Sequence, residues 1–190
     1  DLNRDGFIAG EGGAAMIVED YDHAKARGAK IYCEIIGYGT SNDAYDMISL
    51  HETGRGLKRA MKAAIKKAGI DPAEIDYINP HGSATPSNDA VETMVFKEIM
   101  GAAAYKTTIS SVKPITGHCM GASGSVEALA CIMAIRDQRV PPTINYTTPD
   151  PECDLDYVPN VARQRRVKVS VSTSVGLGGH NSCLIFREAT

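Results

Sequence analysis

The sequence predicts a mixed α/β fold, with helices packed on the faces of a sheet. Strand and helix patterns alternate along the 190 residues, and glycines separate them. The last two strand patterns, Val167–Thr173 and Cys183–Phe186, flank the turn Gly176–Gly179, which is typical of a hairpin. The composition, 43% hydrophobic and 23% charged, is that of a globular protein and excludes disorder and coiled coil.

The first third of the chain predicts two strands and one short helix. Ala14–Val18 is a short apolar run that predicts a strand. Tyr21–Arg27 is rich in Ala and Lys and predicts a helix, closed by Gly28. Lys30–Tyr38 predicts the second strand. Ser41–Thr53 is polar and aperiodic, so we expect a loop there.

The clearest helix pattern is Gly56–Ala68, with apolar residues three and four apart and Gly69 placed as its cap. Its opposite face is rich in Lys and Arg. A solvated helix face is the commoner reason for such a pattern, and docking of an acidic partner is the alternative. Ile75–Ile78 predicts a short buried strand. Asn88 is placed to N-cap a helix that runs to Met100. Its expected apolar face consists of Val91, Met94, Val95 and Ile99.

The second half adds a strand and a long apolar helix before the hairpin. Thr108–Val112 is β-branched and predicts the strand. Val126–Arg136 has apolar side chains around most of its circumference, so we expect this helix to be buried rather than amphipathic. Pro141 and Pro142 stop it. Strand and helix patterns thus alternate along the chain and are followed by the hairpin.

Charge and cysteine content exclude several classes of protein. The chain has 20 Lys and Arg against 23 Asp and Glu, a net charge of −3, without the basic cluster of a nucleic-acid or anionic-membrane surface. No apolar run approaches the roughly 20 residues of a membrane span. Five cysteines without a CxxC pair indicate reduced thiols in a cytoplasmic protein. No signal peptide opens the chain, and its start at Asp1 rather than Met predicts a piece of a longer protein.

Three histidines lie where a strand pattern meets a glycine-rich turn: His81, His118 and His180. One such histidine is usually structural, but three at comparable places favour a ligand site at the ends of the strands. Metal binding is the competing chemistry. The sequence has no HxxH or HExxH spacing, so we expect no catalytic metal. Lys113 and Glu127 lie in largely uncharged sequence surroundings. Because an unpaired buried charge is costly, we expect them to pair with each other or with a ligand.

At these residues the chain resembles the β-ketoacyl-acyl-carrier-protein synthases, the condensing enzymes of type II fatty-acid synthesis in the thiolase superfamily. Asn79–Thr85 is similar to the family motif Asn-x-His-Gly-Thr-x-Thr, and Lys113–His118 to Lys-x-x-x-Gly-His. Glu127 falls where the family has a helix glutamate. The flanking matches are Arg4–Phe7, Gly10–Gly12, Ser41–Tyr45 and Gly178–Asn181.

The resemblance implies a thiolase-like fold in which residues 1–190 form one C-terminal domain, a mixed five-stranded sheet with helices on both faces. It implies an acyltransferase of lipid metabolism that performs a decarboxylating Claisen condensation. The family's nucleophilic cysteine belongs to an N-terminal half outside these residues, so we expect this chain alone to be inactive in condensation. No cofactor is expected, because the substrate carries phosphopantetheine on acyl carrier protein.

The resemblance also assigns site residues. His81 and His118 would donate hydrogen bonds to the malonyl thioester. Lys113 and Glu127 would form a buried pair that orients His118 and tunes its protonation. The backbone N–H of Leu177 would complete the oxyanion hole. Further substrate-binding residues would be Gly176, Gly178, Ser83, Thr85 and Thr116. Some family members hold a structural cation, for which the candidate ligands here are Asn79, Glu127, Ser172 and Asn181.

Some positions depart from the family pattern. Leu177 replaces the phenylalanine that gates the acyl pocket, and Val175 stands where phenylalanine is common. Ser83-Ala84 replaces Thr-Ser, which removes a hydroxyl near the pantetheine arm. Cys119 follows His118, and a neighbouring imidazole can lower a thiol pKa. Adjacent residues in an extended turn point apart, however, so a nucleophilic Cys119 is the less favoured alternative.

Partners and rival functions complete the expectations. The expected partners are acyl carrier protein, the N-terminal half and, in the complete protein, a second copy in a homodimer. Arg55, Lys58, Arg59 and Lys62 are weak candidates for carrier docking. The main rival is a non-catalytic partner subunit that resembles a chain-length factor. A non-decarboxylating thiolase ranks last, because Cys183 follows the glycine-rich turn rather than preceding it.

Overall fold

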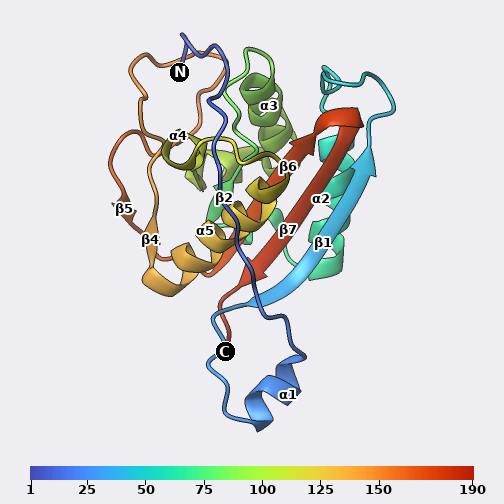
Figure 1. Ribbon diagram of the computed structural model, residues 1–190, viewed down its shortest axis with the longest axis vertical. Helices are drawn as coiled ribbons and strands as arrows, with labels where there is room; N and C mark the ends of the chain where they lie inside the picture. Colours follow the sequence, from blue (N-terminus) through green and yellow to red (C-terminus); the bar gives the residue numbers. More distant parts are fainter.

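The computed structural model describes all residues from Asp1 to Thr190. Its centre is a five-stranded sheet in the order β1-β7-β6-β2-β3 (Figure 1). The strands are β1 (Glu34–Asn42), β2 (Tyr77–Asn79), β3 (Thr108–Ile109), β6 (Val169–Gly176) and β7 (His180–Arg187). β7 runs antiparallel to both β1 and β6, whereas β2 is parallel to β6 and β3. The predicted mixed five-stranded sheet is therefore confirmed.

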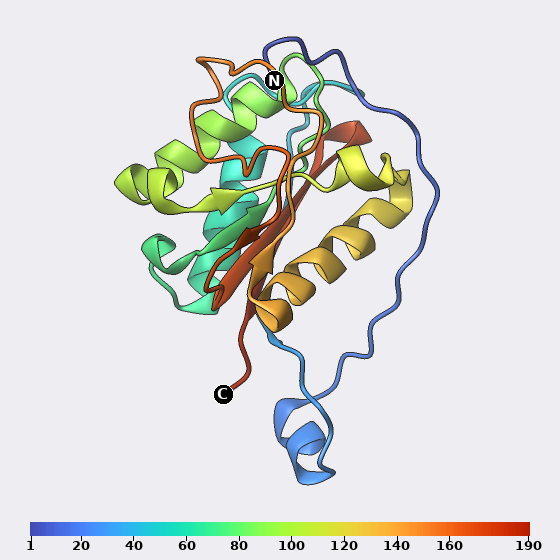
Figure 2. The ribbon, with the colours of Figure 1, turned by 90° about the vertical axis from the view of Figure 1, so that its left-hand side faces the viewer.

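Helices cover both faces of this sheet, as predicted. α2 (Arg55–Ala68) and α3 (Asn88–Met100) lie on one face, and α5 (Ser123–Asp137) lies on the other (Figure 2). The short elements are α1 (Tyr21–Ala26), α4 (Lys113–Thr116), the β4–β5 pair (Arg139–Val140, Arg163–Gln164) and four 3₁₀ turns (Pro72–Glu74, Gly101–Lys106, Met120–Ala122, Leu177–Gly179). α1 projects beyond one end of the sheet (Figure 1).

Period-two alternation along the strands builds a hydrophobic core on each face. On β2, Ile78 packs with residues of α2 and α3, whereas its neighbour Tyr77 packs with α5. On β7, Ile185 and Phe186 divide between the faces in the same way. A strand covered on both faces is buried throughout, and the first five residues of β6 are all buried.

Two predicted strands differ from the structure. β1 begins at Glu34 rather than at Lys30, because β7, its only neighbour in the sheet, ends at Arg187 opposite Glu34. It continues to Asn42, into the predicted loop. The predicted strand Ala14–Val18 is wrong for this structure, since the segment makes no backbone hydrogen bond and has no neighbouring strand. The predicted strand at Thr108 is real, but it leaves the sheet after Ile109.

The helices are close to the prediction, with corrections at α3 and α5. Asn88 is the first residue of α3 and not its cap; its side-chain amide donates to Asp89 and Glu92. Met94 is exposed rather than on the buried face. α5 is not buried all round, because Met133 and the nearby Leu129 are 41% and 40% exposed. α2 and its αL cap at Gly69 are confirmed.

Two glycines let α2 approach β1 closely. A Cβ on Gly39 would lie 2.0 Å from the carbonyl oxygen of Ala60, and one on Gly37 would lie 2.4 Å from that of Ala64. Backbone oxygens inside a helix cannot move aside without breaking helical hydrogen bonds. The glycines therefore set the distance between this helix and the sheet. No helix of the protein has the length and apolar character needed to cross a membrane.

We predict that Gly39→Ala destabilises the protein by about 3 kcal/mol, because the new methyl group must displace backbone rather than side chain. The measurement is the free energy of unfolding from urea denaturation. The control is Gly124→Ala, where the nearest atom to a new Cβ is Ser174 Oγ at 3.9 Å. Equal stability of Gly39→Ala and Gly124→Ala would show that the close approach imposes no constraint.

Candidate active site

Two histidines from distant parts of the sequence face each other beyond the end of β2. His81 follows β2 after one residue, and His118 lies between α4 and α5. Their ring centroids are 5.4 Å apart, with the planes at 74°. Of the three histidines that the sequence places at strand ends, the structure brings these two together. His180, the third histidine of the pattern, is exposed at the start of β7.

The backbone at His81 is held by Glu92, a buried carboxylate that the sequence analysis did not single out. Its oxygens accept from the N–H groups of His81 at 2.8 Å and Gly82 at 2.7 Å. They also accept from Asn88 Nδ2 at 2.8 Å and Thr173 Oγ1 at 3.1 Å. Burial raises the pKa of Glu92 to about 7, and the two backbone donors oppose that rise. Glu92 thus ties α3 and β6 to the turn that carries His81.

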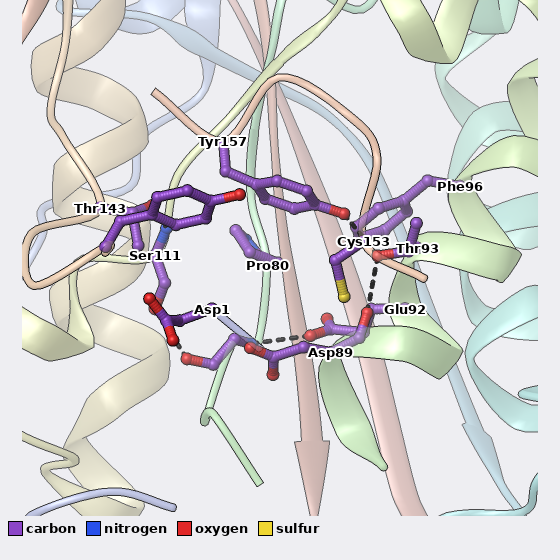
Figure 3. A pocket seen from close by; sticks show the side chains of 12 residues that line it. Asp1, Pro80, Asp89, Glu92, Thr93, Phe96, Ser111, Thr143, Cys153 and Tyr157 are labelled. Carbon is purple, nitrogen blue, oxygen red and sulfur yellow. Dashed lines mark hydrogen bonds between the residues drawn. The ribbon is translucent and has the colours of Figure 1, made fainter. Parts of the chain in front are cut away.

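Figure 3 shows Glu92 in the wall of a pocket behind this turn. Pro80 and Gly82 line the pocket, but His81 between them does not. Gly82 has a φ of 47°, and a Cβ there would lie 2.6 Å from that of Ser111. Only glycine fits this conformation and this space, so the backbone can bend towards Glu92. The sequence signal for Glu92 was its position four residues after Asn88, on the helix that follows the motif.

Lys113 and Glu127 form the buried ion pair that the sequence predicts. The Lys113 ammonium also donates to the backbone carbonyl of His81. Burial raises the pKa of Glu127, and the ammonium opposes that rise. The expectation that this pair orients His118 needs correction. Its direct contact is with the His81 backbone, and it acts on His118 through charge rather than through a hydrogen bond.

His118 is held by other groups. Its backbone N–H donates to the carbonyl oxygen of Ile8 at 2.8 Å, and its own carbonyl oxygen accepts from the backbone N–H of Gly10 at 3.1 Å. The ring of Phe7 lies 4.5 Å from the imidazole. The Nδ1 atom accepts from the backbone N–H of Met120 at 3.1 Å. An N–H group can only donate, so Nδ1 carries no proton, and the proton of the neutral ring is on Nε2.

Both imidazoles are neutral at pH 7. Burial lowers the pKa of His81 to about 2, with the Lys113 charge as the second cause. Burial also lowers the pKa of His118, and Lys113 contributes again. Neutral imidazoles beside each other can each present one N–H as a hydrogen-bond donor without bringing a proton to the site.

The glycine-rich turn between β6 and β7 lies against the loop after β1. Gly178 donates its N–H to the Met47 carbonyl at 2.7 Å and accepts from Asn42 Nδ2 at 2.9 Å. Gly176 ends β6, and the side chain of Leu177 is 70% exposed. The turn therefore exposes an apolar side chain to solvent at the end of two inner strands of the sheet.

The other expected substrate-binding residues lie near the histidines in sequence but differ in their exposure to solvent. Ser83 is buried, and its hydroxyl lies 3.4 Å from that of Thr85. Thr116 is exposed on α4, where its hydroxyl donates to the carbonyls of Val112 at 3.3 Å and Gly117 at 2.9 Å. Its hydroxyl is thus engaged within its own turn.

The four candidate cation ligands divide between the two faces of the sheet. Asn79 pairs in register with Ser172, and Asn79 shares the α5 side with Tyr77, two residues before it. The amide of Asn79 and Oε2 of Glu127 are buried without hydrogen-bond partners in the protein. Asn181 packs instead against α2, where a Cβ on Gly56 would lie 2.4 Å from its Nδ2. Contrary to the prediction, Asn181 therefore does not lie with the other three.

The cysteines in the structure are unpaired thiols. Burial raises the pKa of Cys33 to about 11 and of Cys183 to about 12, and raises those of Cys131 and Cys153. These four are therefore protonated at neutral pH and poor nucleophiles. Cys119 Sγ lies 3.8 Å from the carbonyl oxygen of Thr116 and 3.9 Å from that of Gly117, in the turn that precedes His118.

The chain matches the family described as "Beta-ketoacyl synthase, C-terminal domain" over residues 32–147. This protein belongs to the beta-ketoacyl synthase family. It is 50% identical over 185 residues to "Putative polyketide beta-ketoacyl synthase 1" of Streptomyces cyaneus, covering 97% of this chain and 44% of that protein. It is 49% identical over 188 residues to "3-oxoacyl-[acyl-carrier-protein] synthase 2" of a Synechocystis strain, covering 99% of this chain and 45% of that protein.

Solved structures agree with the fold of this synthase chain. A ketosynthase chain described as "AntDE:AntF (apo): type II PKS acyl-carrier protein in complex with its ketosynthase bound to the hexaketide" superimposes with a TM-score of 0.93 at 40% identity. That match covers all of this chain and 46% of the other. "The ishigamide ketosynthase/chain length factor" gives 0.95 at 36% identity, again over all of this chain and 46% of the other. The chain thus spans about half the length of these relatives.

We predict that His81 makes the free energy of unfolding depend on pH. The unfolded chain binds a proton at this histidine below its ordinary pKa of 6.5, and the native state does not, so stability falls as the pH drops through that value. Between about pH 7.5 and 5.5, the wild type should lose about 1 kcal/mol more than His81→Gln. Urea denaturation at the two pH values measures this difference. Equal losses would mean that His81 is protonated in the native state.

Proposed function

We propose that this chain is the C-terminal half of a 3-oxoacyl-[acyl-carrier-protein] synthase, which elongates an acyl chain with malonyl units. The observation that carries the proposal is the pair of neutral imidazoles, His81 and His118, facing each other at the end of β2. Two neutral N–H donors suit an oxygen on which negative charge develops, because they stabilise it without protonating it beforehand.

In the proposed reaction, His81 and His118 donate to the carbonyl oxygen of the malonyl thioester. The bond to the carboxylate breaks, CO2 leaves, and its electron pair remains as the enolate. The enolate carbon attacks an acyl thioester on the cysteine of the N-terminal half, and the backbone N–H of Leu177 helps to hold the resulting oxyanion. Collapse expels the cysteine thiolate and leaves the 3-oxoacyl group on the carrier. Each donor contributes about 3 kcal/mol to such a transition state.

The Lys113–Glu127 pair has a supporting role. Its ammonium fixes the carbonyl of His81, and its charge adds to the burial that lowers the pKa of both imidazoles. A protonated imidazole would lose a proton to the enolate and quench it before condensation. The pair therefore protects the carbanion by keeping protons away from the two rings.

The substrate would arrive on acyl carrier protein, as a thioester of its phosphopantetheine arm, and no further cofactor is needed. Ser83 and Thr85 would hydrogen-bond the arm near His81, with Thr116 at the opposite side. The flexible Gly176 and Gly178 would let Leu177 lie against the acyl chain. Leucine is smaller than the family's usual phenylalanine at this place and would accommodate a larger group. The complete protein would be a homodimer in the cytoplasm.

An exposed apolar surface supports the proposal of a second half. α5 presents Leu129, Ile132 and Met133 to a hollow that is also lined by the segment Ala15–Val18 and by residues between Glu19 and Ile35. Ile17 is 93% exposed, and the segment has unpaired backbone. A strand-like segment and an apolar helix face without cover are unstable in water. We propose that the N-terminal half covers this surface and supplies a strand beside the segment.

A polyketide ketosynthase is the second candidate, since one relative at 50% identity carries that name. It would use the same residues with a different acyl chain. A chain-length-factor-like subunit is the third. Such a subunit performs no condensation and therefore does not need the set His81, Lys113, His118 and Glu127. The presence of all four residues favours a condensing enzyme.

We predict that His81→Ala in the complete protein lowers kcat of condensation about 10²–10³-fold, the loss expected for one donor to a developing oxyanion. The measurement is formation of 3-oxoacyl carrier protein from malonyl and acyl carrier proteins. His23→Ala is the control, because His23 lies on α1 with its side chain 69% exposed and should leave the rate unchanged. Unchanged condensation by His81→Ala would instead support the chain-length-factor-like reading.

A range of acyl carrier substrates in the same assay separates the two enzymatic candidates. A single elongation of saturated acyl groups supports the fatty-acid synthase, and repeated extension without reduction supports the polyketide enzyme. In both cases the 190-residue chain alone should form no 3-oxoacyl product, because the acyl-accepting thiol is supplied by the other half. Product from this chain alone would contradict that assignment.

We predict that Met133→Lys destabilises the complete protein by about 3 kcal/mol, because it places an unpaired charge in the interface between the halves. The measurement is urea denaturation of the complete protein. Val161→Lys is the matched control, an apolar residue 74% exposed that does not line this hollow. If both variants change stability by less than about 0.5 kcal/mol, the α5 surface is not covered by the other half.

A further inference from the structure

The Nδ1 atom of His118 has a second partner that the proposed mechanism does not use. Ser123 Oγ lies 2.9 Å from it, and the Ser123 side chain is buried. Ser123 is the first residue of α5, five residues after His118, so the start of the helix brings the hydroxyl back to the ring. The backbone N–H of Met120 points at the same nitrogen from 3.1 Å.

The Met120 contact decides which way the Ser123 hydroxyl points. A serine hydroxyl can donate or accept, and an imidazole Nδ1 can do either according to its protonation. The Met120 N–H is fixed by the backbone and can only donate, so Nδ1 is an acceptor. The Ser123 hydroxyl must then donate to it as well. Two donors from different directions converge on one nitrogen, which fixes both the tautomer and the plane of the ring.

The remaining contacts of the ring leave its rotation less restrained. Phe7 lies 4.5 Å away with its plane tilted by 60°, and the His81 ring meets it edge-on at 5.4 Å. Burial lowers the His118 pKa, and the Lys113 ammonium adds to this shift through its charge rather than through a hydrogen bond. None of these groups holds Nδ1 by a directional bond, which leaves that role to Met120 and Ser123.

We propose that Ser123 is a positioning residue of the synthase: its hydroxyl holds the His118 ring so that Nε2–H points at the substrate oxygen. This inference rests on the proposed function, because it concerns the same oxygen. Ser123 touches no reacting atom and acts only through His118. Its removal should therefore impair the chemical step while leaving carrier binding intact.

The test compares Ser123→Ala with the wild type in the complete protein. The kcat of condensation should fall about tenfold, the equivalent of ~1.4 kcal/mol, with KM for malonyl carrier protein nearly unchanged. Ser123→Thr keeps the hydroxyl and should restore most of the rate. The matched control is Ser125→Ala in the same helical turn, whose hydroxyl donates to the Ala122 carbonyl at 2.9 Å and does not reach His118.

A second readout is independent of activity. In protein labelled with ¹⁵N in its histidine rings, the Nδ1 resonance of His118 reports the hydrogen bonds that it accepts; its assignment comes from the spectrum of His118→Gln. Ser123→Ala should move this resonance towards that of a free, unprotonated nitrogen, whereas Ser125→Ala should leave it in place. An unmoved resonance in Ser123→Ala overturns the proposal, as does an unchanged kcat.

The two readouts separate this inference from the proposed function. If His81→Ala condenses normally, the proposed function fails, yet the resonance shift in Ser123→Ala still reports the hydrogen bond. If His81→Ala is inactive and Ser123→Ala is fully active, only the role of Ser123 is wrong. Serine to alanine at the first position of a helix is compatible with the fold, since alanine has high helix propensity.

Discussion

A buried lysine–glutamate pair joins the two segments on which the site depends. Lys113 reaches from α4 to Glu127 on α5 and to the backbone carbonyl of His81. The start of α5 carries Ser123, which in turn contacts His118. Removing either charge would leave the other buried without a partner, which typically costs 3–5 kcal/mol. The pair therefore fixes the His81 backbone and sets the electrostatic surroundings of both histidines.

In the proposed mechanism the histidines act as donors rather than as bases, and burial together with the charge of Lys113 explains how they can. An imidazole in water is half protonated near its pKa of 6.5, and as a cation it would donate its proton to a carbanion. Burial and the Lys113 charge together depress the pKa of His81 and His118. Glu92, on the far side of the His81 turn, anchors the backbone through N–H groups and leaves the ring itself free to face substrate.

Local patterns predicted the fold well where an element packs within this chain. The helix at Gly56–Ala68 shows its buried face as a repeat in the sequence, and the structure places it within one residue. Ala14–Val18 has a strand pattern but no partner strand, so pattern alone misassigned it. Asn181 was grouped with Asn79 by motif, although alternation on β7 turns it to the other face. Glu92 was missed because two of its four donors are backbone N–H groups, which leave no trace in residue types, and a third, Thr173, lies 81 residues away in the sequence.

The most direct test is CO2 release from malonyl carrier protein by the complete protein after its acyl-accepting thiol has been alkylated. Condensation is then blocked, and only the groups around His81 and His118 remain to stabilise the enolate. Continued CO2 release that disappears in His118→Ala would show that this half performs the decarboxylation. Release that stops on alkylation alone, or that survives His118→Ala, would contradict the assignment of that step to the two histidines.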